Sequence, residues 1–208
     1  MKNRLAQLIF LAFFQSTALA QSSLEPCRKD FIDAYHVGVN KVIDDAVAVP
    51  SSLQLTTFPS FQAESGLRLV ASKVYFVEFQ TSFWGDSYVV DRKENGRMDF
   101  TKPRTVAKSR SAPLRSDTAQ RIGRAYSKAI TEATQSGRTG LDGTAYVLST
   151  GKGDCAWAWS PEPNSQNGQL IELMRRLETH TKFSSLIDLQ RSEKSIIQLL
   201  NTIERVGK

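Results

Sequence analysis

The residue types that most often carry catalysis or bind metal ions are scarce in this chain. Among its 208 residues are two histidines, His36 and His180, and two cysteines, Cys27 and Cys155. Neither type forms the closely spaced pairs of a zinc or haem motif, and no Gly-x-Ser-x-Gly sequence marks a nucleophilic serine. We therefore assign no catalytic residue, metal ion or cofactor, and interpret both histidines as ordinary helix residues.

Carboxylates leave one route to catalysis open, because two acidic side chains from distant segments can converge as general acid and general base. Asp142 also has a plainer explanation, since it precedes a glycine and can accept a hydrogen bond within its own turn. A small hydrolase of the cell envelope is accordingly the alternative function. The candidate carboxylates are Glu64, Glu78, Asp86, Asp91 and Asp142.

Positive charge gathers in one segment of a chain whose formal net charge is +6. On the helix predicted over 117–136, Arg121, Arg124 and Lys128 lie opposite the apolar stripe. We interpret this face as a surface for an anionic or acidic macromolecule; an ordinary solvated face is the alternative. No aromatic residues alternate with these basic ones, so we do not expect nucleic acid. The basic residues of the segment are Lys102, Arg104, Lys108, Arg110, Arg115, Arg121, Arg124 and Lys128.

Two adjacent aromatic residues, Phe83 and Trp84, form a second candidate binding site. They precede Gly85 and Asp86 between two predicted strands. Large aromatic side chains are frequent in interface hot spots, so an exposed loop here would dock a partner. The alternative is that both rings fold back onto the core. With these two surfaces and no catalytic motif, we expect a non-enzymatic binding protein, such as an inhibitor or an immunity-type protector.

The first twenty residues predict an export signal. Lys2 and Arg4 precede an apolar run over 5–14, and the segment ends in Ala18-Leu19-Ala20, the order typical of a secretory signal peptide. The apolar run is shorter than a membrane span requires. We therefore expect cleavage after Ala20, a single mature domain over 21–208, a periplasmic or secreted location, and no membrane anchor after cleavage.

An even number of cysteines in an exported chain favours a disulfide. Pairing Cys27 with Cys155 would close a long loop and remove conformational entropy from the unfolded chain. Two buried free thiols are the alternative. The expected oxidising compartment makes the disulfide our prediction.

Hydrophobic periodicity predicts strands and helices that arrive in runs rather than in strict alternation. Residues 73–79 are apolar on both faces, which is typical of an interior strand. This order predicts an α+β fold, in which a mainly antiparallel sheet packs against several helices. The expected segments are helices over 27–48 and 117–136, β structure over 53–109 with a turn at Asn95-Gly96, a hairpin over 144–160, and two C-terminal helices containing 170–177 and 196–203.

One short pattern resembles a known group of proteins. The residues Leu141-Asp142-Gly143-Thr144-x-Tyr146 are followed by Trp159-Ser160-Pro161 and a leucine-rich helix. This pattern is similar to one in small exported bacterial proteins of unassigned function. The resemblance implies export and a hairpin followed by a helix, and it implies no activity.

Overall fold

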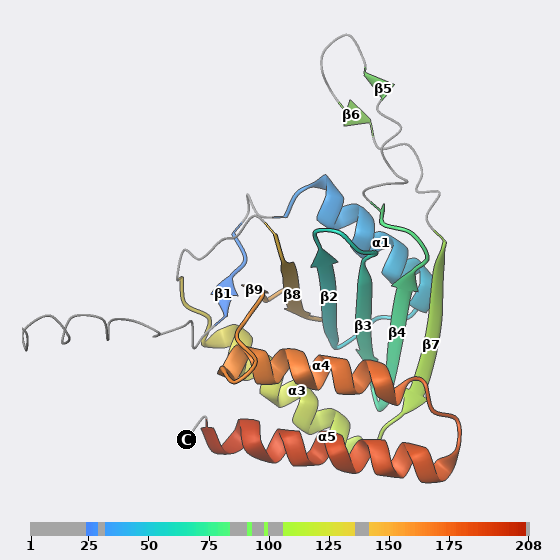
Figure 1. Ribbon diagram of the computed structural model, residues 1–208, viewed down its shortest axis with the longest axis vertical. Helices are drawn as coiled ribbons and strands as arrows, with labels where there is room; N and C mark the ends of the chain where they lie inside the picture. The colour runs from blue at the N-terminus through green and yellow to red at the C-terminus, as the bar shows by residue number, and fades with distance from the viewer. Residues whose placement is uncertain are drawn as a thin grey trace, which may run out of the picture.

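A seven-stranded antiparallel sheet forms the centre of the computed structural model, in the order β1-β9-β8-β2-β3-β4-β7 (Figure 1). The structure describes residues 24–28, 32–83, 91–92, 98–99, 106–135 and 142–206. Helices cover both faces of the sheet, so the predicted α+β class is confirmed. The strands of the sheet are β1 (Glu25–Pro26), β2 (Leu53–Pro59), β3 (Ser65–Val70), β4 (Lys73–Phe79), β7 (Ala107–Pro113), β8 (Thr144–Thr150) and β9 (Cys155–Trp159).

The strand predicted over 73–79 is confirmed at the same residues as β4. It pairs with β3 on one side and β7 on the other, and both of its faces are covered, which explains its apolar character on both faces. The predicted hairpin over 144–160 is also present, as β8 and β9. Two short strands, β5 (Asp91–Arg92) and β6 (Met98–Asp99), pair with each other, and the turn predicted between them lies outside the described residues.

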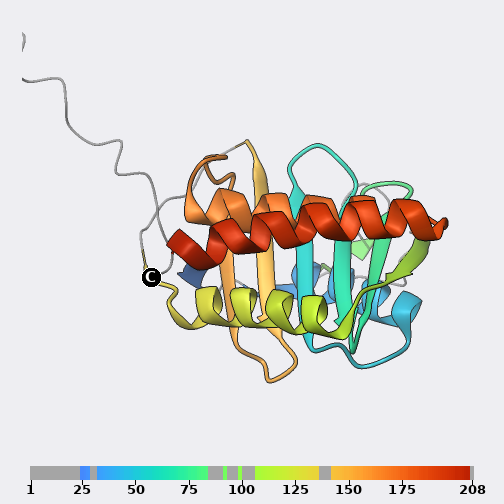
Figure 2. The same ribbon diagram turned by 90° about the horizontal axis from the view of Figure 1, so that it is seen from below.

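The helices form layers on the two faces of the sheet. Helix α1 (Ala34–Val47) lies behind the sheet in Figure 1, and α4 (Gln166–His180) lies in front. Helix α3 (Ser116–Thr131) shares the face of α4, and α5 (Leu186–Val206) packs across α3 and α4 as an outer layer (Figure 2). The two predicted C-terminal helices are therefore confirmed, and they meet the helix that carries the basic residues.

Strand alternation divides the buried side chains into two cores. Each large side chain that is fully buried contributes about 1.5–3 kcal/mol. The core on the α3–α5 side includes Leu55, Leu67, Phe76, Leu148, Leu173 and Ile196. The core on the α1 side includes Val39, Ile43, Phe58, Val77, Phe79 and Trp157.

The first helix begins later than the sequence predicts. Asp33 caps it by accepting a hydrogen bond from the backbone N–H of His36 at 3.0 Å, and the helix starts at Ala34 instead of residue 27. Glu25 and Pro26, which precede the predicted range, pair with β9 as an edge strand, where a proline is tolerated. Residues 27 and 28 follow this strand and are not helical.

Helix α3 confirms the second predicted helix, although it ends at Thr131, before the predicted end at residue 136. The cap position is Arg115, and Asp117 lies within the first turn. The side chain of Asp117 pairs with that of Arg115, whose hydrogen bond lowers the pKa of the carboxyl group. A negative charge in a first turn is favourable because the N-terminal end of a helix carries partial positive charge.

A buried arginine joins α1 to the sheet. Arg68 of β3 is 1% exposed, and its Nε donates to Asp44 Oδ1 at 2.8 Å. Its Nη2 also donates to Asn40 Oδ1 at 3.0 Å. Burial lowers the pKa of Arg68, and the charge of Asp44 opposes that effect. This interaction fixes α1 against the sheet and was not predicted from the sequence.

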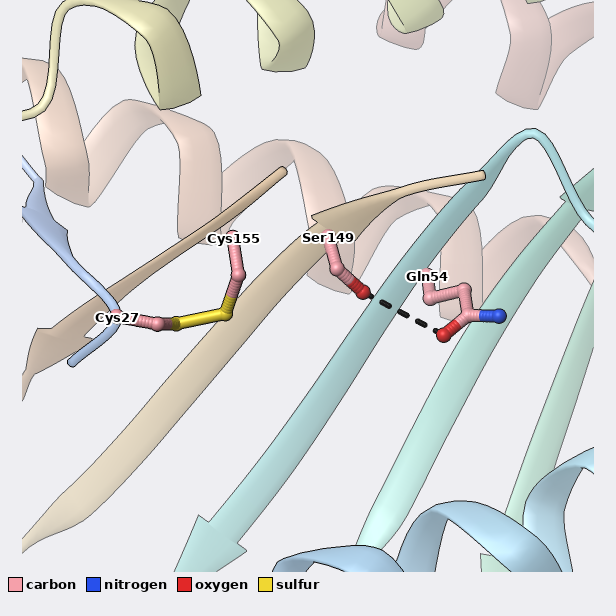
Figure 3. Close-up of a disulfide and its surroundings, with 4 residues drawn as sticks. All are labelled: Cys27, Gln54, Ser149 and Cys155. Carbon is pink, nitrogen blue, oxygen red and sulfur yellow. Dashed lines mark hydrogen bonds between the residues drawn. A yellow bond between two sulfur atoms is a disulfide. The ribbon is translucent and has the colours of Figure 1, made fainter. Parts of the chain in front are cut away.

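Cys27 and Cys155 form a disulfide, as predicted, with their Cα atoms 5.3 Å apart (Figure 3). The backbone N–H of Cys27 also donates to the carbonyl of Cys155 at 3.1 Å. On the neighbouring strands, Ser149 Oγ donates to Gln54 Oε1 at 3.4 Å. The disulfide thus fastens the segment after β1 to the start of β9.

Within the described part of the chain, no helix is both long and apolar enough to cross a bilayer.

Candidate functional site

The three basic residues predicted to bind a partner lie on the wall of one groove. Arg121, Arg124 and Lys128 of α3 line a hollow of about 440 Å³, here called the basic groove. Their spacing of three and four residues places them on one side of the helix. The other lining residues come from α3, α4 and α5 and are Ala125, Ala129, Gln166, Leu170, Ile203 and Glu204.

The floor of the basic groove is apolar and continuous with the core. Ala125 and Ala129 are small, so they leave room beside Leu170 and Ile203. Below them, Tyr126 is fully buried, and its hydroxyl donates to the carbonyl of Leu170 at 2.7 Å. Burial raises the pKa of Tyr126. This bond fixes α3 relative to α4, and therefore fixes the width of the groove.

Arg121 connects two walls of the groove. Its Nε and Nη2 donate to the two carboxylate oxygens of Glu204 on α5, at 3.0 and 2.8 Å. Its Nη2 also donates to Asn201 Oδ1 at 2.6 Å. Donating these hydrogen bonds to the carboxylate of Glu204 raises the pKa of Arg121. Because this side chain is only 21% exposed, its main role is to join α3 to α5.

Arg124 and Lys128 present the positive charge of the groove to solvent. Both side chains are exposed. Arg124 has no hydrogen-bond or ion-pair partner among the described residues, and Lys128 Nζ lies 3.8 Å from Glu132 Oε1. Among the residues that line the groove, Glu204 is the single acidic one. The groove can therefore accept carboxylates through charge-assisted hydrogen bonds above an apolar floor.

The structure does not unite the whole basic stretch. Arg110 of β7 lies elsewhere, with its Nη1 2.9 Å from Glu78 Oε1 and its guanidinium 4.6 Å from the ring centre of Phe76. Arg115 pairs with Asp117. Residues 102 and 104 lie outside the described residues. The predicted binding residues of α3 thus form a separate cluster.

The described candidate carboxylates do not converge. Glu64 is buried on the α1 side, where Oε2 accepts from the backbone N–H of Phe83 at 2.7 Å and Oε1 accepts from the hydroxyl of Tyr35. Glu78 faces the α4 side and pairs with Arg110, while Asp142 is exposed in a loop. The side chains at 86 and 91 lie outside the description. The described residues also contain no group of three or more His, Cys, Asp or Glu side chains that could hold a metal ion.

The expectation of an exposed aromatic loop is wrong at Phe83. This side chain is 3% exposed and packs in the α1-side core, with its ring centre 5.9 Å from that of Tyr35. Gly38 makes the space, because a Cβ atom there would lie 2.7 Å from Phe83 Cζ. Trp84, the other predicted binding aromatic, lies outside the described residues.

The two histidines lie in helical segments, as expected. His36 is partly exposed, and its Nδ1 lies 2.8 Å from Asp33 Oδ1. His180 ends α4 but is fully buried, with its Nε2 2.8 Å from the carbonyl oxygen of Pro113. Its ring therefore packs inside the domain and not at an exposed helix end.

Comparison with known proteins gives no relative from which residue roles could be transferred. No family model, curated protein or solved structure matches the chain. The fold and site define an α+β domain with one disulfide and one basic groove. The geometry and charge of that groove are therefore the observations from which a function can be inferred.

Proposed function

We propose that this chain is an exported, non-enzymatic binding protein that uses the basic groove to hold an acidic segment of a macromolecular partner. An inhibitor or an immunity-type protector is the role that fits such a protein. The observation that carries the proposal is the position of Arg121, Arg124 and Lys128 around one apolar floor.

The groove suits a protein segment better than an isolated anion. Its floor, with Leu170 and Ile203, can bury an aliphatic or aromatic side chain of the partner, as helix-binding grooves do. Acidic residues beside that side chain would then meet Arg124 and Lys128. Complementary charge of this kind accelerates association and selects the partner.

The disulfide supports an extracytoplasmic location. Disulfides persist in oxidising compartments such as the bacterial periplasm or the external medium, and the chain forms one between Cys27 and Cys155. The export signal predicted over residues 1–20 agrees with this location. Mass measurement of protein from fractionated cells tests it, since the proposal requires an N-terminus at Gln21 in the exported fraction.

The proposed binding is tested with a fluorescein-labelled amphipathic peptide of leucine and glutamate, titrated with the full protein by fluorescence anisotropy. The double variant Arg124→Gln/Lys128→Gln should bind at least about tenfold more weakly, equivalent to about 1.4 kcal/mol. Polyglutamate of the same length, which lacks apolar side chains, should also bind more weakly than the amphipathic peptide.

Lys152→Gln provides the matched control. Lys152 is exposed on the turn between β8 and β9 and does not line the groove, so this variant loses one positive charge without changing a groove residue. The affinity of this variant for the peptide should equal that of the unmodified protein. Peptide binding by the unmodified protein should weaken as added salt screens the charges. The basic groove would not be the binding site if the double variant bound the peptide as tightly as the unmodified protein. The same would follow if the affinity did not change from low to high salt.

A further inference from the structure

We propose a second binding site, independent of the basic groove, in a cleft between α4 and the sheet, and we assign it a small hydroxylated carboxylic acid such as an acidic sugar. Two adjoining hollows form this cleft, with volumes of about 330 and 230 Å³. Both are lined by Thr144, Tyr146 and Arg175, so Arg175 stands where the two hollows meet. We call this region the Arg175 cleft.

The charge balance of the Arg175 cleft favours an anion. Arg175 is exposed and has no hydrogen-bond or ion-pair partner within the described ranges. Glu178 is the single acidic residue among those lining the two hollows. Its carboxylate is already ion-paired, because Oε1 lies 3.0 Å from Lys182 Nζ and 3.7 Å from Arg110 Nη2. The uncompensated charge in the cleft is therefore the guanidinium of Arg175.

A single guanidinium selects a carboxylate over a more highly charged group. Its planar fork can donate two parallel hydrogen bonds to the two oxygens of one carboxylate. The other residues lining the cleft are neutral, apart from Glu178. One cation balances the single negative charge of a carboxylate, whereas a phosphate monoester carries up to two near neutral pH.

Neutral polar groups in the cleft favour a ligand with hydroxyl groups. The hydroxyls of Ser65 and Tyr146 and the side-chain amide of Gln62 line the larger hollow without a hydrogen-bond partner in the described part of the chain. Ser65 and Tyr146 lie in register on either side of Thr57, on the face of the sheet that lines the hollow, and Gln62 lies in the loop before β3. Each can both donate and accept, which matches the hydroxyl groups of a sugar.

The test is calorimetric titration of the full protein with D-glucuronate, with D-glucose, acetate and glucose 6-phosphate as comparison ligands. Glucuronate should bind saturably, and each comparison ligand should bind at least tenfold more weakly. Arg175→Gln should reduce glucuronate affinity at least tenfold, while circular dichroism shows an unchanged fold. Arg124→Gln is the matched control, because it removes an exposed arginine of the basic groove and should leave glucuronate affinity unchanged.

Three results would overturn this assignment. They are a glucuronate signal that does not saturate, a comparison ligand whose affinity lies within tenfold of that of glucuronate, and an unchanged glucuronate affinity in Arg175→Gln. The proposal for the basic groove is tested separately, because binding of the acidic peptide depends on Arg124 and Lys128. The Arg175→Gln variant should therefore bind that peptide as tightly as the unmodified protein.

Discussion

Replacing Cys27 and Cys155 together by serine tests how much the disulfide contributes to stability. The disulfide joins residues 128 positions apart. For a loop of that length the chain-entropy model gives a loss of about 17 cal/mol/K in the unfolded chain, or about 5 kcal/mol at 25 °C. Measured effects are often smaller than the model value, so we expect the double variant to lose about 3–5 kcal/mol.

The native structure should survive this change. The segment around β1 keeps its backbone pairing with β9, and Leu24 remains buried in the core on the α3–α5 side. The effect therefore lies mainly in the unfolded ensemble, which becomes more expanded without the cross-link. Unfolding in urea should show a lower midpoint and a steeper dependence on denaturant, since more surface becomes exposed.

Tryptophan fluorescence provides the assay, because Trp157 is buried and Trp159 is half-buried beside the disulfide. The unmodified protein measured in reductant is the control, and it should behave like the double serine variant. An identical midpoint for the oxidised, reduced and serine forms would refute the entropic argument. Free thiols in the exported protein would refute the disulfide itself.

Four further substitutions have opposite or pH-dependent expected effects on stability. Gly168→Ala places a Cβ atom against the carbonyl oxygen of Glu162 and should destabilise the protein by about 1–3 kcal/mol. Gly123→Ala meets no described atom within 4 Å and should stabilise it by about 0.5–1 kcal/mol. Equal melting temperatures for the two variants would contradict both expectations. Asp33→Ala should cost about 1 kcal/mol at pH 7 in urea unfolding. Burial raises the pKa of Asp33, but hydrogen bonds from His36 outweigh this effect and lower it. The contribution of Asp33 to stability is therefore present above about pH 4 and is lost as the pH falls through the lowered pKa. A stability difference between the variant and the unmodified protein that persists at pH 2 would contradict this. Burial raises the pKa of Tyr126, so the stability of the unmodified protein should fall as the pH rises above about 10. Tyr126→Phe should be about 1 kcal/mol less stable at neutral pH and should show a smaller fall at high pH. Parallel curves of stability against pH for the two proteins would contradict this.

Local signals made most of the sheet predictable. The strand over 73–79 and the hairpin over 144–160 follow from alternation and turn residues, which act over a few positions. Arg68 shows where such reasoning fails. A charged residue in a strand is expected at the surface, but its partner Asp44 lies 24 positions away on α1 and compensates its burial.

The candidate site was predictable in part for the same reason. Helical spacing alone places Arg121, Arg124 and Lys128 on one face. The apolar floor is supplied by Leu170 and Ile203, which reach the groove only through the packing of α4 and α5. The aromatic prediction was wrong at Phe83 because the space for its ring is made by Gly38, 45 positions earlier in the sequence.

Hydrogen–deuterium exchange of the full protein with the leucine–glutamate peptide tests the basic groove most directly. Bound peptide should slow exchange over residues 121–129 of α3 and near Glu204 at the end of α5, and should leave exchange in α1 unchanged. This protection should disappear in Arg124→Gln/Lys128→Gln. Protection that lies on α1 or in the Arg175 cleft, or that survives in the double variant, would contradict the proposal that the basic groove holds an acidic partner.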